Sequence, residues 1–459
     1  MGNSMSMFSS LSRQKKEAVG LLQIGTFLEY FDLMLYVHMA VLLNELFFPK
    51  TDPHTAALLT ALAFCSTYVL RPFGALVFGY IGDNIGRKTT VIITTMMMAV
   101  SCVVMANLPT YAQIGIAATW VVTVCRIVQG LSSMGEIIGA QIYVSEITNP
   151  PTSYPAISFL SVAASIGGFA ALGVATLTTR IGFDWRIAFW IGACIAVVGS
   201  VARTRLRETP DFVDMKRKLK ASIEECKKIN TRMEEKLLKK VSVFRKDKIS
   251  KKTFLSYFLV ECGSPISFFL IYIYFNITLK SFYGYSPQDI IFHNFMLAII
   301  QVIQTLVWAI ASYHFCPLML LRIKGTICLL LLLFVPVCSS CNVGVSYVFL
   351  LQAFLLMFNL DAVPAEYCFI KQFPVYKRFT VCSVAYALGR AVSYVMISFG
   401  MIYMTKWLGS YGVWLIVLPI TIGVLWGVNH FEKLENQKHH QVHTPHPLSI
   451  KPDELKLTG

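Results

Sequence analysis

The stretch GYIGDNIGRKT, from Gly79 to Thr89, places three glycines and three charged residues between two long apolar segments. Glycine permits a tight turn and lets a neighbouring helix approach closely. Asp83 is positioned to cap the N-terminus of the following helix, and Arg87 to pair with an acid across the mouth between helices. A simple turn between membrane helices does not require this spacing. The stretch therefore predicts a functional turn, with Asp83, Gly86 and Arg87 in a gate.

The composition around this turn is that of a membrane protein. The 459 residues are 55% hydrophobic and 14% charged, with a mean hydropathy of +0.60, whereas soluble domains carry about 25% charged residues. Apolar segments long enough to cross a bilayer are helices, because a helix satisfies its own backbone groups in lipid. Twelve such segments run near 20–47, 56–80, 89–107, 112–138, 154–178, 186–205, 253–280, 288–313, 323–342, 345–371, 380–405 and 410–430. The predicted fold is an all-α polytopic membrane protein with twelve transmembrane helices in two six-helix bundles.

A long charged loop separates the two sets of six helices. The two bundles are expected to face each other across a site near the membrane midplane. The predicted regions are an N-terminal arm (1–19), a first bundle (20–206), a basic connector (207–252), a second bundle (253–431) and a disordered tail (432–459). Cys338 and Cys341 form a lone CxxC near the predicted outer face, without the second pair or histidine that a zinc site needs.

The net charge of +15 is concentrated outside the apolar segments. Between Arg203 and Lys252 there are 18 Lys/Arg and 8 Asp/Glu, so this loop holds +10 of the +15. This placement follows the positive-inside rule, predicts cytoplasmic termini and argues against nucleic-acid binding. Apolar residues recur in the connector at helical spacing, which predicts an amphipathic helix on the anionic inner leaflet; a helix that binds a partner is the alternative.

Two acids lie within the first apolar segment. Glu29, Asp32 and Tyr36 share one helix face. A charged residue at membrane depth is costly unless it faces a partner or a wet cavity, so it is a functional hypothesis by default. Either acid could carry a proton. The alternative is that one of them only neutralises a residue on a neighbouring helix, such as Arg126.

The stretch RIVQGLSSMGEIIGA, from Arg126 to Ala140, carries a second polar stripe. Arg126, Gln129 and Glu136 fall on one face of the expected helix, among glycines that permit close packing. Arg126 is a candidate counter-charge to the acids of the first helix, or half of an ion pair that only locks two helices together. Glu136 is expected nearer the cytoplasm, serving the gate with Arg87.

These motifs together resemble a known family. The pattern G-x-x-x-D-x-x-G-R-K resembles the signature loop of the major facilitator superfamily. With E-Y-F-D from Glu29, R-P-F-G from Arg71 and the stretch from Arg126, it resembles the metabolite:proton symporters, which include proline/betaine, α-ketoglutarate and shikimate transporters. The resemblance implies a bacterial inner-membrane location.

The second half matches this family less closely. The loop from Phe373 to Thr380 resembles the F-P-x-x-x-R-x-T pattern of the family and marks Arg378 as a gate residue, as Glu146 is in the first half. Between the eighth and ninth segments the family's D-R-x-G-R is absent, and Arg322 and Lys324 stand there instead. The family's Tyr-Asn in the eleventh segment is Tyr386 followed by alanine. These departures fall on the second gate.

Polar residues recur along several apolar segments of the second half. Each stripe alone could hold helices together, but several in one half favour a wet cavity. The candidate cavity residues are Tyr36, Gln129, Tyr272, Gln301, Trp308, Asn359, Tyr386 and Arg390. Ser158, Ser161, Ser165 and Gly168 are instead expected to form a packing seam.

The resemblance implies proton-coupled uptake of a small polar metabolite, with Asp32 or Glu29 as the proton carrier. Arginines suit a carboxylate and aromatic rings suit a quaternary ammonium, so the residues leave the substrate class open. The close resemblance of the first two segments to the family implies a zwitterionic osmolyte such as proline or betaine. The alternatives are an organic-acid symporter, an uncoupled facilitator and a sensor that transports nothing. No nucleophile–base pair, nucleotide loop or metal cluster occurs at convincing spacing, so neither an enzyme nor a cofactor is expected.

Overall fold

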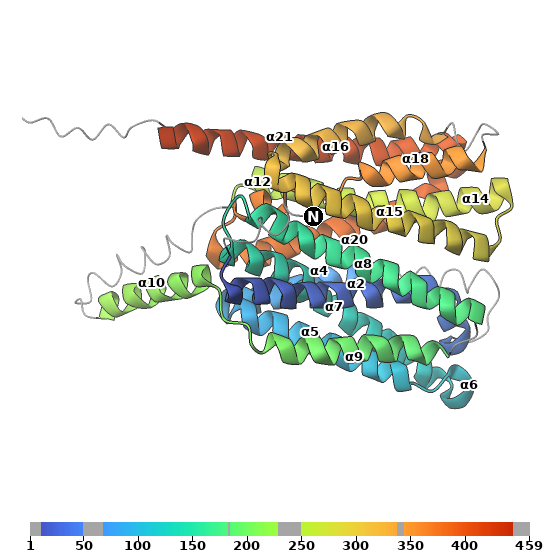
Figure 1. Cartoon of the computed structure of the whole chain (residues 1–459), viewed down its shortest axis with the longest axis horizontal. Coiled ribbons are helices and arrows are strands. Elements are labelled where there is room, and N and C mark those ends of the chain that lie inside the picture. Colours follow the sequence, from blue (N-terminus) through green and yellow to red (C-terminus); the bar gives the residue numbers. More distant parts are fainter. Residues whose placement is uncertain (1–10, 49–67, 182–183, 228–248, 337–343, 444–459) are drawn as a thin grey trace, which may run out of the picture.

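The computed structural model describes residues 11–48, 68–181, 184–227, 249–336 and 344–443, and all regular structure in these ranges is helical. The first half contains one helix for each predicted segment that the described residues cover, and a short extra turn, α6 (Figure 1). Its helices are α2 (Arg13–Phe47), α4 (Arg71–Asn84), α5 (Arg87–Asn107), α6 (Tyr111–Ile114), α7 (Ile116–Ile147), α8 (Ser153–Ile181) and α9 (Trp185–Arg203).

The connector contributes α10 (Pro210–Lys227), and the second half follows it. The helices there are α12 (Lys251–Glu261), α13 (Gly263–Phe268), the π-helix η1 (Phe269–Tyr274), α14 (Phe275–Tyr283), α15 (Pro287–His314), α16 (Pro317–Leu332), α18 (Val345–Met357), α19 (Glu366–Ile370), α20 (Val375–Leu408), the 3₁₀ turn η2 (Gly409–Tyr411) and α21 (Gly412–His443). If α12 to α14 are taken as one interrupted helix and α18 with α19 as another, the described residues contain six long helices before α10 and six after it.

The helices are built to lie in lipid. Eight described helices are long and apolar enough to cross a membrane, and Trp185–Val201 and Val345–Met357 are shorter apolar helices. Large apolar side chains such as Trp120 and Val201 point outward and are two-thirds exposed. Such surfaces would be unfavourable in water but are matched by acyl chains. The chain is an integral membrane protein.

The two halves lie side by side with their helices roughly parallel (Figure 1). Helix α4 packs against α20, and α8 packs against α15. Two glycines allow the first contact: a Cβ on Gly79 would meet the backbone of Thr380, and one on Gly82 would meet the ring of Phe379. The GYIGDNIGRKT stretch therefore brings α4 against the partner half as well as forming a turn.

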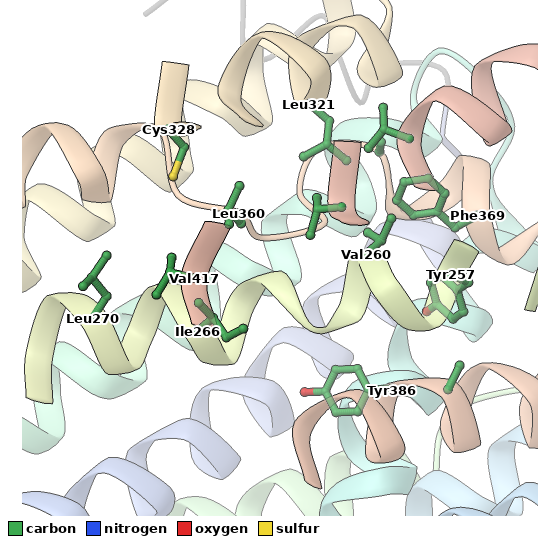
Figure 2. Close-up of a cluster of buried hydrophobic side chains, with 14 of the residues drawn as sticks. Tyr257, Val260, Ile266, Leu270, Leu321, Cys328, Leu360, Phe369, Tyr386 and Val417 are labelled. Atoms are coloured by element: carbon green, nitrogen blue, oxygen red, sulfur yellow. The ribbon is translucent and has the colours of Figure 1, made fainter. Parts of the chain in front are cut away.

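Each half has an apolar interior. In the second half, Tyr257, Ile266 and Leu270 pack towards residues of α16, α19 and α21 and the segment after α18 (Figure 2). The first half has several apolar clusters, which are formed by residues of α2, α5, α7, α8 and α9. One of these clusters contains the edge-to-face pair of Phe47 and Trp185, whose ring centroids are 5.2 Å apart. This packing holds the polar residues described below in place.

The tenth predicted helix is broken, which corrects the continuous helix expected over 345–371. Helix α18 ends at Met357, and the chain stays irregular until Glu366. Pro364 lacks a backbone N–H and disfavours helical geometry before it. Trp308 Nε1 donates to the Met357 carbonyl (2.8 Å), and Leu360 N donates to Ser267 Oγ (3.1 Å). Irregular backbone at membrane depth requires such partners.

Two further expectations change. Helix α21 continues past Phe431 to His443, so the first part of the predicted disordered tail is helical. Helix α10 projects beyond the ends of the bundle helices, anchored through the buried Phe212, and does not lie across them as an interfacial helix would (Figure 1). The rest of the connector stripe, the segment 56–67, and Cys338 with Cys341 lie outside the described residues.

Candidate functional site

A cavity of about 190 Å³ lies between the two halves. Helices α2 and α8 line it from the first half, together with Arg71 of α4 and with Ile137 and Gln141 of α7. The second half contributes α12, α13, η1, α15, α20 and the irregular segment after α18. The polar and charged residues on its wall include Tyr30, Arg71, Gln141, Glu261, Asp361, Glu366 and Tyr394. A polar cavity between two membrane-embedded bundles is suited to a small polar ligand.

Five of the eight predicted cavity residues line this cavity: Tyr272, Gln301, Asn359, Tyr386 and Arg390. Tyr272 donates to Gln301 Oε1 (2.8 Å), which joins η1 to α15. Tyr36, Gln129 and Trp308 do not line it. The first two lie inside the first bundle, and Trp308 supports the break after α18.

The predicted packing seam on α8 also faces the cavity. Ser161, Ser165 and Gly168 line its wall, and Ser165 is hydrogen-bonded to Thr305 of α15 (3.2 Å). Their small side chains therefore leave space between the halves as well as allowing helices to approach.

Asp32 lies within a complete set of partners inside the first bundle. Gln129 Nε2 donates to one carboxylate oxygen (3.0 Å), Arg126 Nη1 lies 3.5 Å from the other, and Cys102 Sγ is 3.6 Å from the first. The Arg126 guanidinium also lies over the Tyr36 ring, 3.9 Å from its centroid. The structure thus brings together four of the residues predicted from two separate motifs.

Glu29 has different surroundings. Its side chain is 1% exposed, yet neither carboxylate oxygen has a hydrogen-bond partner in the described part of the chain. An ionised carboxylate without a partner is costly in such a place, whereas the protonated acid avoids most of that cost. The two acids of the first helix are therefore not equivalent.

Glu136 does not meet Arg87, which corrects the predicted gate pair. It forms a buried ion pair with Arg203 at the end of α9, and Thr94 and Thr95 donate to the same carboxylate. Arg203 Nη2 also donates to the Leu22 carbonyl (3.2 Å). The sequence indicated Arg203 only as one of the basic residues of the connector loop, because no sequence spacing links it to Glu136.

Asp83 joins the two halves. Its carboxylate accepts hydrogen bonds from the backbone N–H groups of Phe379 (3.1 Å) and Thr380 (2.9 Å) and from the Thr380 hydroxyl (2.7 Å). It does not cap α5 as predicted. Glu208 does so, accepting from the N–H groups of Arg87 (3.0 Å) and Lys88 (3.3 Å).

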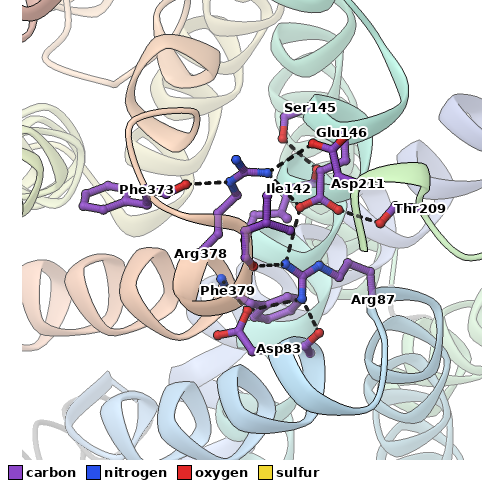
Figure 3. Close-up of polar contacts among 12 residues, drawn as sticks. Asp83, Arg87, Ile142, Ser145, Glu146, Thr209, Asp211, Phe373, Arg378 and Phe379 are labelled. Atoms are coloured by element: carbon purple, nitrogen blue, oxygen red, sulfur yellow. Dashed lines mark hydrogen bonds and ion pairs between the residues drawn. The ribbon is translucent and has the colours of Figure 1, made fainter. Parts of the chain in front are cut away.

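Arg87 and Arg378 extend this connection (Figure 3). Arg87 lies 3.2 Å from Asp83 and 3.4 Å from Glu146, and it donates to the Val375 carbonyl of the other half (2.6 Å). Arg378 lies 2.9 Å from the same Glu146 oxygen and 3.4 Å from Asp211 at the start of α10. We call Asp83, Arg87, Glu146, Asp211 and Arg378 the inter-half network.

The inter-half network lies at one end of the molecule. Asp83 ends α4, Glu146 ends α7, and Arg378 begins α20, whereas the cavity residues of α20, Tyr386 to Tyr394, follow Arg378 along the helix. We call this the α10 end, because α10 starts there. The network closes the space between the halves on the α10 side of the cavity.

The second half has its own buried charges. Arg390 lies 3.1 Å from Glu261 and stacks over the Tyr386 ring, and Tyr257 donates to Glu366 (2.7 Å). Lys324 is fully buried, forms an ion pair with Asp361, and donates to the Val363 carbonyl (2.8 Å). The sequence marked Lys324 only as a departure from the family pattern.

Residues 22–390 match the family model described as the Major Facilitator Superfamily. Among curated proteins, the chain is 36% identical over 197 residues to the inner membrane metabolite transport protein YhjE of Escherichia coli (strain K12), covering 41% of this chain and 45% of that one. It is 32% identical over 204 residues to the proline/betaine transporter of Salmonella typhimurium, covering 43% of this chain and 41% of that one. These matches span less than half the length of the curated relatives.

Solved structures extend the likeness of the fold to about nine-tenths of the chain. The proton:xylose symporter XylE bound to 6-bromo-6-deoxy-D-glucose superposes with a TM-score of 0.74 at 14% identity, covering 91% of this chain and 95% of that one. The human organic anion transporter MFSD10 gives a TM-score of 0.63 at 13% identity, covering 91% and 100%. At these identities the likeness concerns the fold alone.

Proposed function

This chain belongs to the Major Facilitator Superfamily, and from that premise we propose that it carries a small polar metabolite across the membrane, coupled to protons, by alternating access. One observation supports this above all. A polar cavity lies between the halves, and a network of charges between the same halves closes one side of it. Breaking such a network while another closes on the opposite side would expose the cavity to each side in turn.

The α10 end is proposed to face the cytoplasm. The loop that begins there, from Arg203 to Lys252, holds most of the net positive charge, which the positive-inside rule assigns to the cytoplasmic side. A curated relative is named as an inner membrane protein, and we propose the bacterial inner membrane for this chain as well. Asp83, Gly86, Arg87, Glu146 and Arg378 would then form the cytoplasmic gate.

Proton coupling is proposed to act through Asp32 or Glu29. Both acids are buried on α2, and neither lines the cavity. Neutralising one of them by protonation would remove a buried charge and make the inward change of conformation easier. Asp32 would gain and lose its proton next to Arg126, whereas Glu29 would do so without an ion-pair partner among the described residues.

The proposed substrate is a zwitterion of the size of proline or betaine. The cavity wall carries charges of both signs, since Arg71 and Arg390 line it together with Glu261 and Asp361. Two curated relatives from enteric bacteria are named as proline/betaine transporters. An organic acid is the second candidate, supported by the two arginines.

The test combines binding with flux. A thermal-shift screen of the purified protein against amino acids, betaines and organic acids identifies a ligand, and proteoliposomes then report its uptake. We expect an inward proton gradient to drive accumulation and a protonophore to abolish it. Uptake indifferent to the protonophore would indicate a facilitator, and binding without flux would indicate a sensor. Either result contradicts the proposal.

A further inference from the structure

Arg71 is a buried cation on the cavity wall that lacks an anionic partner. Its side chain is 2% exposed, and its Nε atom has no hydrogen-bond partner in the described part of the chain. Across the described residues, no carboxylate lies within ion-pair distance of its guanidinium, which rests 4.5 Å from the centroid of the Tyr68 ring. The other arginine of the wall, Arg390, is already paired with Glu261. A guanidinium buried without an anion costs several kcal/mol, so this position favours an anionic ligand.

Glu29 is the complementary case on the adjacent α2. It is buried, its two oxygens have no hydrogen-bond partner among the residues that the structure describes, and it does not line the cavity. Leu33, one helical turn after Glu29 on α2, shares an apolar cluster with Tyr68, and the Arg71 guanidinium lies over that same ring. Within the described residues, an acid without a hydrogen-bond partner therefore lies near an arginine without an anion, and only the arginine lines the cavity.

We propose that Arg71 binds the carboxylate group of the transported molecule and that Glu29, once ionised, competes with that carboxylate for Arg71. This inference rests on the proposed proton-coupled transport and names both its substrate class and the residue at which proton and substrate meet. Arginine suits this role because it keeps its proton throughout and presents paired N–H donors to a carboxylate.

The exchange balances in charge and protons. With Glu29 protonated, Arg71 is available and the substrate carboxylate pairs with it. When Glu29 releases its proton, its carboxylate takes over Arg71 and the substrate carboxylate is left without a cation. One proton and one carboxylate are thus released together. Coupling needs only that Arg71 serve one anion at a time.

The opposite wall indicates what the rest of the substrate carries. Asp361 lies on the irregular segment after α18, lines the cavity, and is held by the fully buried Lys324. Its carboxylate is partly exposed to the cavity. A substrate with a carboxylate for Arg71 and an ammonium or other donor for Asp361 matches both walls. The cavity wall, with Arg71 on one side and Asp361 on the other, therefore suits zwitterions better than dicarboxylates.

The first experiment measures binding to the purified full-length chain in lipid nanodiscs across a pH series. The probes are L-proline and pyrrolidine, which has the same ring and amine without the carboxylate, and 2-oxoglutarate as a dicarboxylate. We expect proline to bind more tightly than pyrrolidine, with an affinity that falls as pH rises. The variant Glu29→Gln should keep the low-pH affinity at every pH. The variant Arg71→Gln should bind proline on the order of a hundredfold more weakly throughout, as truncating one partner of a buried charge pair does.

A control separates this role from general damage. Arg13→Gln removes an arginine whose exposed ion pair with Glu17 lies away from the cavity, and it should keep the wild-type profile. Pyrrolidine binding equal to proline, or no binding of either carboxylate probe at any pH, would show that Arg71 is not a carboxylate site. A Glu29→Gln variant that retained the wild-type pH dependence would show that Glu29 is not the competitor.

A second experiment needs no ligand. The thermal unfolding temperature of Arg71→Gln should fall as pH rises relative to wild type, because an ionised Glu29 would then lack the guanidinium with which we propose it pairs. Adding Glu29→Gln to that variant should remove the fall. An Arg71→Gln profile parallel to wild type would mean that the two residues do not interact.

Proton-coupled transport and the competition of Glu29 with the substrate for Arg71 can be disproved separately. Proton-driven flux together with unaltered pH profiles in the Arg71 and Glu29 variants would overturn this inference and leave the proposed transport in place. The expected binding profiles without any flux would overturn transport and leave the carboxylate site.

Discussion

Asp32 and Glu29 stand three residues apart on α2, but of these two only Asp32 has hydrogen-bond partners among the described residues. Replacing Asp32 by Asn keeps the hydrogen bond to Gln129 possible and removes the charge opposite Arg126. We expect Asp32→Asn to lose gradient-driven accumulation while it still exchanges substrate across the membrane, because exchange does not require the proton to return. The measurement is uptake and counterflow in matched proteoliposomes. Full gradient-driven accumulation by the variant would exclude Asp32 as a proton carrier.

The Glu136–Arg203 pair is a structural contact at the scale of single residues. Removing one partner of a buried ion pair leaves an uncompensated charge and costs about 3–5 kcal/mol. We therefore expect Glu136→Gln to unfold at a clearly lower temperature and Glu136→Gln with Arg203→Gln to recover part of the loss. Arg322→Gln breaks an exposed pair with Glu432 and should cost less than about 1 kcal/mol. Equal effects of the buried and exposed changes would contradict the assignment.

At the scale of elements, the break between α18 and α19 depends on residues from other helices. Trp308→Phe removes the donor to the Met357 carbonyl, at a cost of about 1 kcal/mol, and should also weaken substrate binding because Asn359 and Asp361 follow the break. Trp120→Phe changes an outward-facing tryptophan and serves as the matched control. Thermal unfolding and ligand titration of both variants check this. Unchanged binding by Trp308→Phe would show that the break is held without the indole.

Hydropathy predicted the helices well because a membrane segment must be both continuous and apolar, and these two properties are visible in a sequence. The same criterion could not reveal the break after Met357, since residues on both sides of it are apolar; Pro364 was the available signal. The partner of Glu136 lies on α9 and that of Lys324 on the irregular segment after α18, both far along the chain. No spacing rule relates such residues, so these contacts require the packed structure.

At the scale of the whole molecule, the cavity and the inter-half network lie between the same two halves. On the α10 side the halves meet through buried charges and through backbone-to-carboxylate bonds at Asp83. Buried ion pairs contribute little net stability against their desolvation. This contact is therefore well suited to break and reform, whereas the apolar clusters within each half stay intact.

The contact of α4 with α20 allows a direct test of whether the halves close the cavity at the α10 end. A Cβ on Gly82 would overlap the Phe379 ring, whereas a Cβ on Gly173 would meet nothing within 4 Å. We expect Gly82→Val to hold the halves apart at the α10 end and Gly173→Val to leave them closed. A cysteine introduced at Gln141, on the cavity wall, reports this in a background free of other cysteines. Its alkylation by an impermeant maleimide added on the α10 side should speed up in the Gly82 variant alone, and equal rates in the two variants would mean that this contact does not close the cavity.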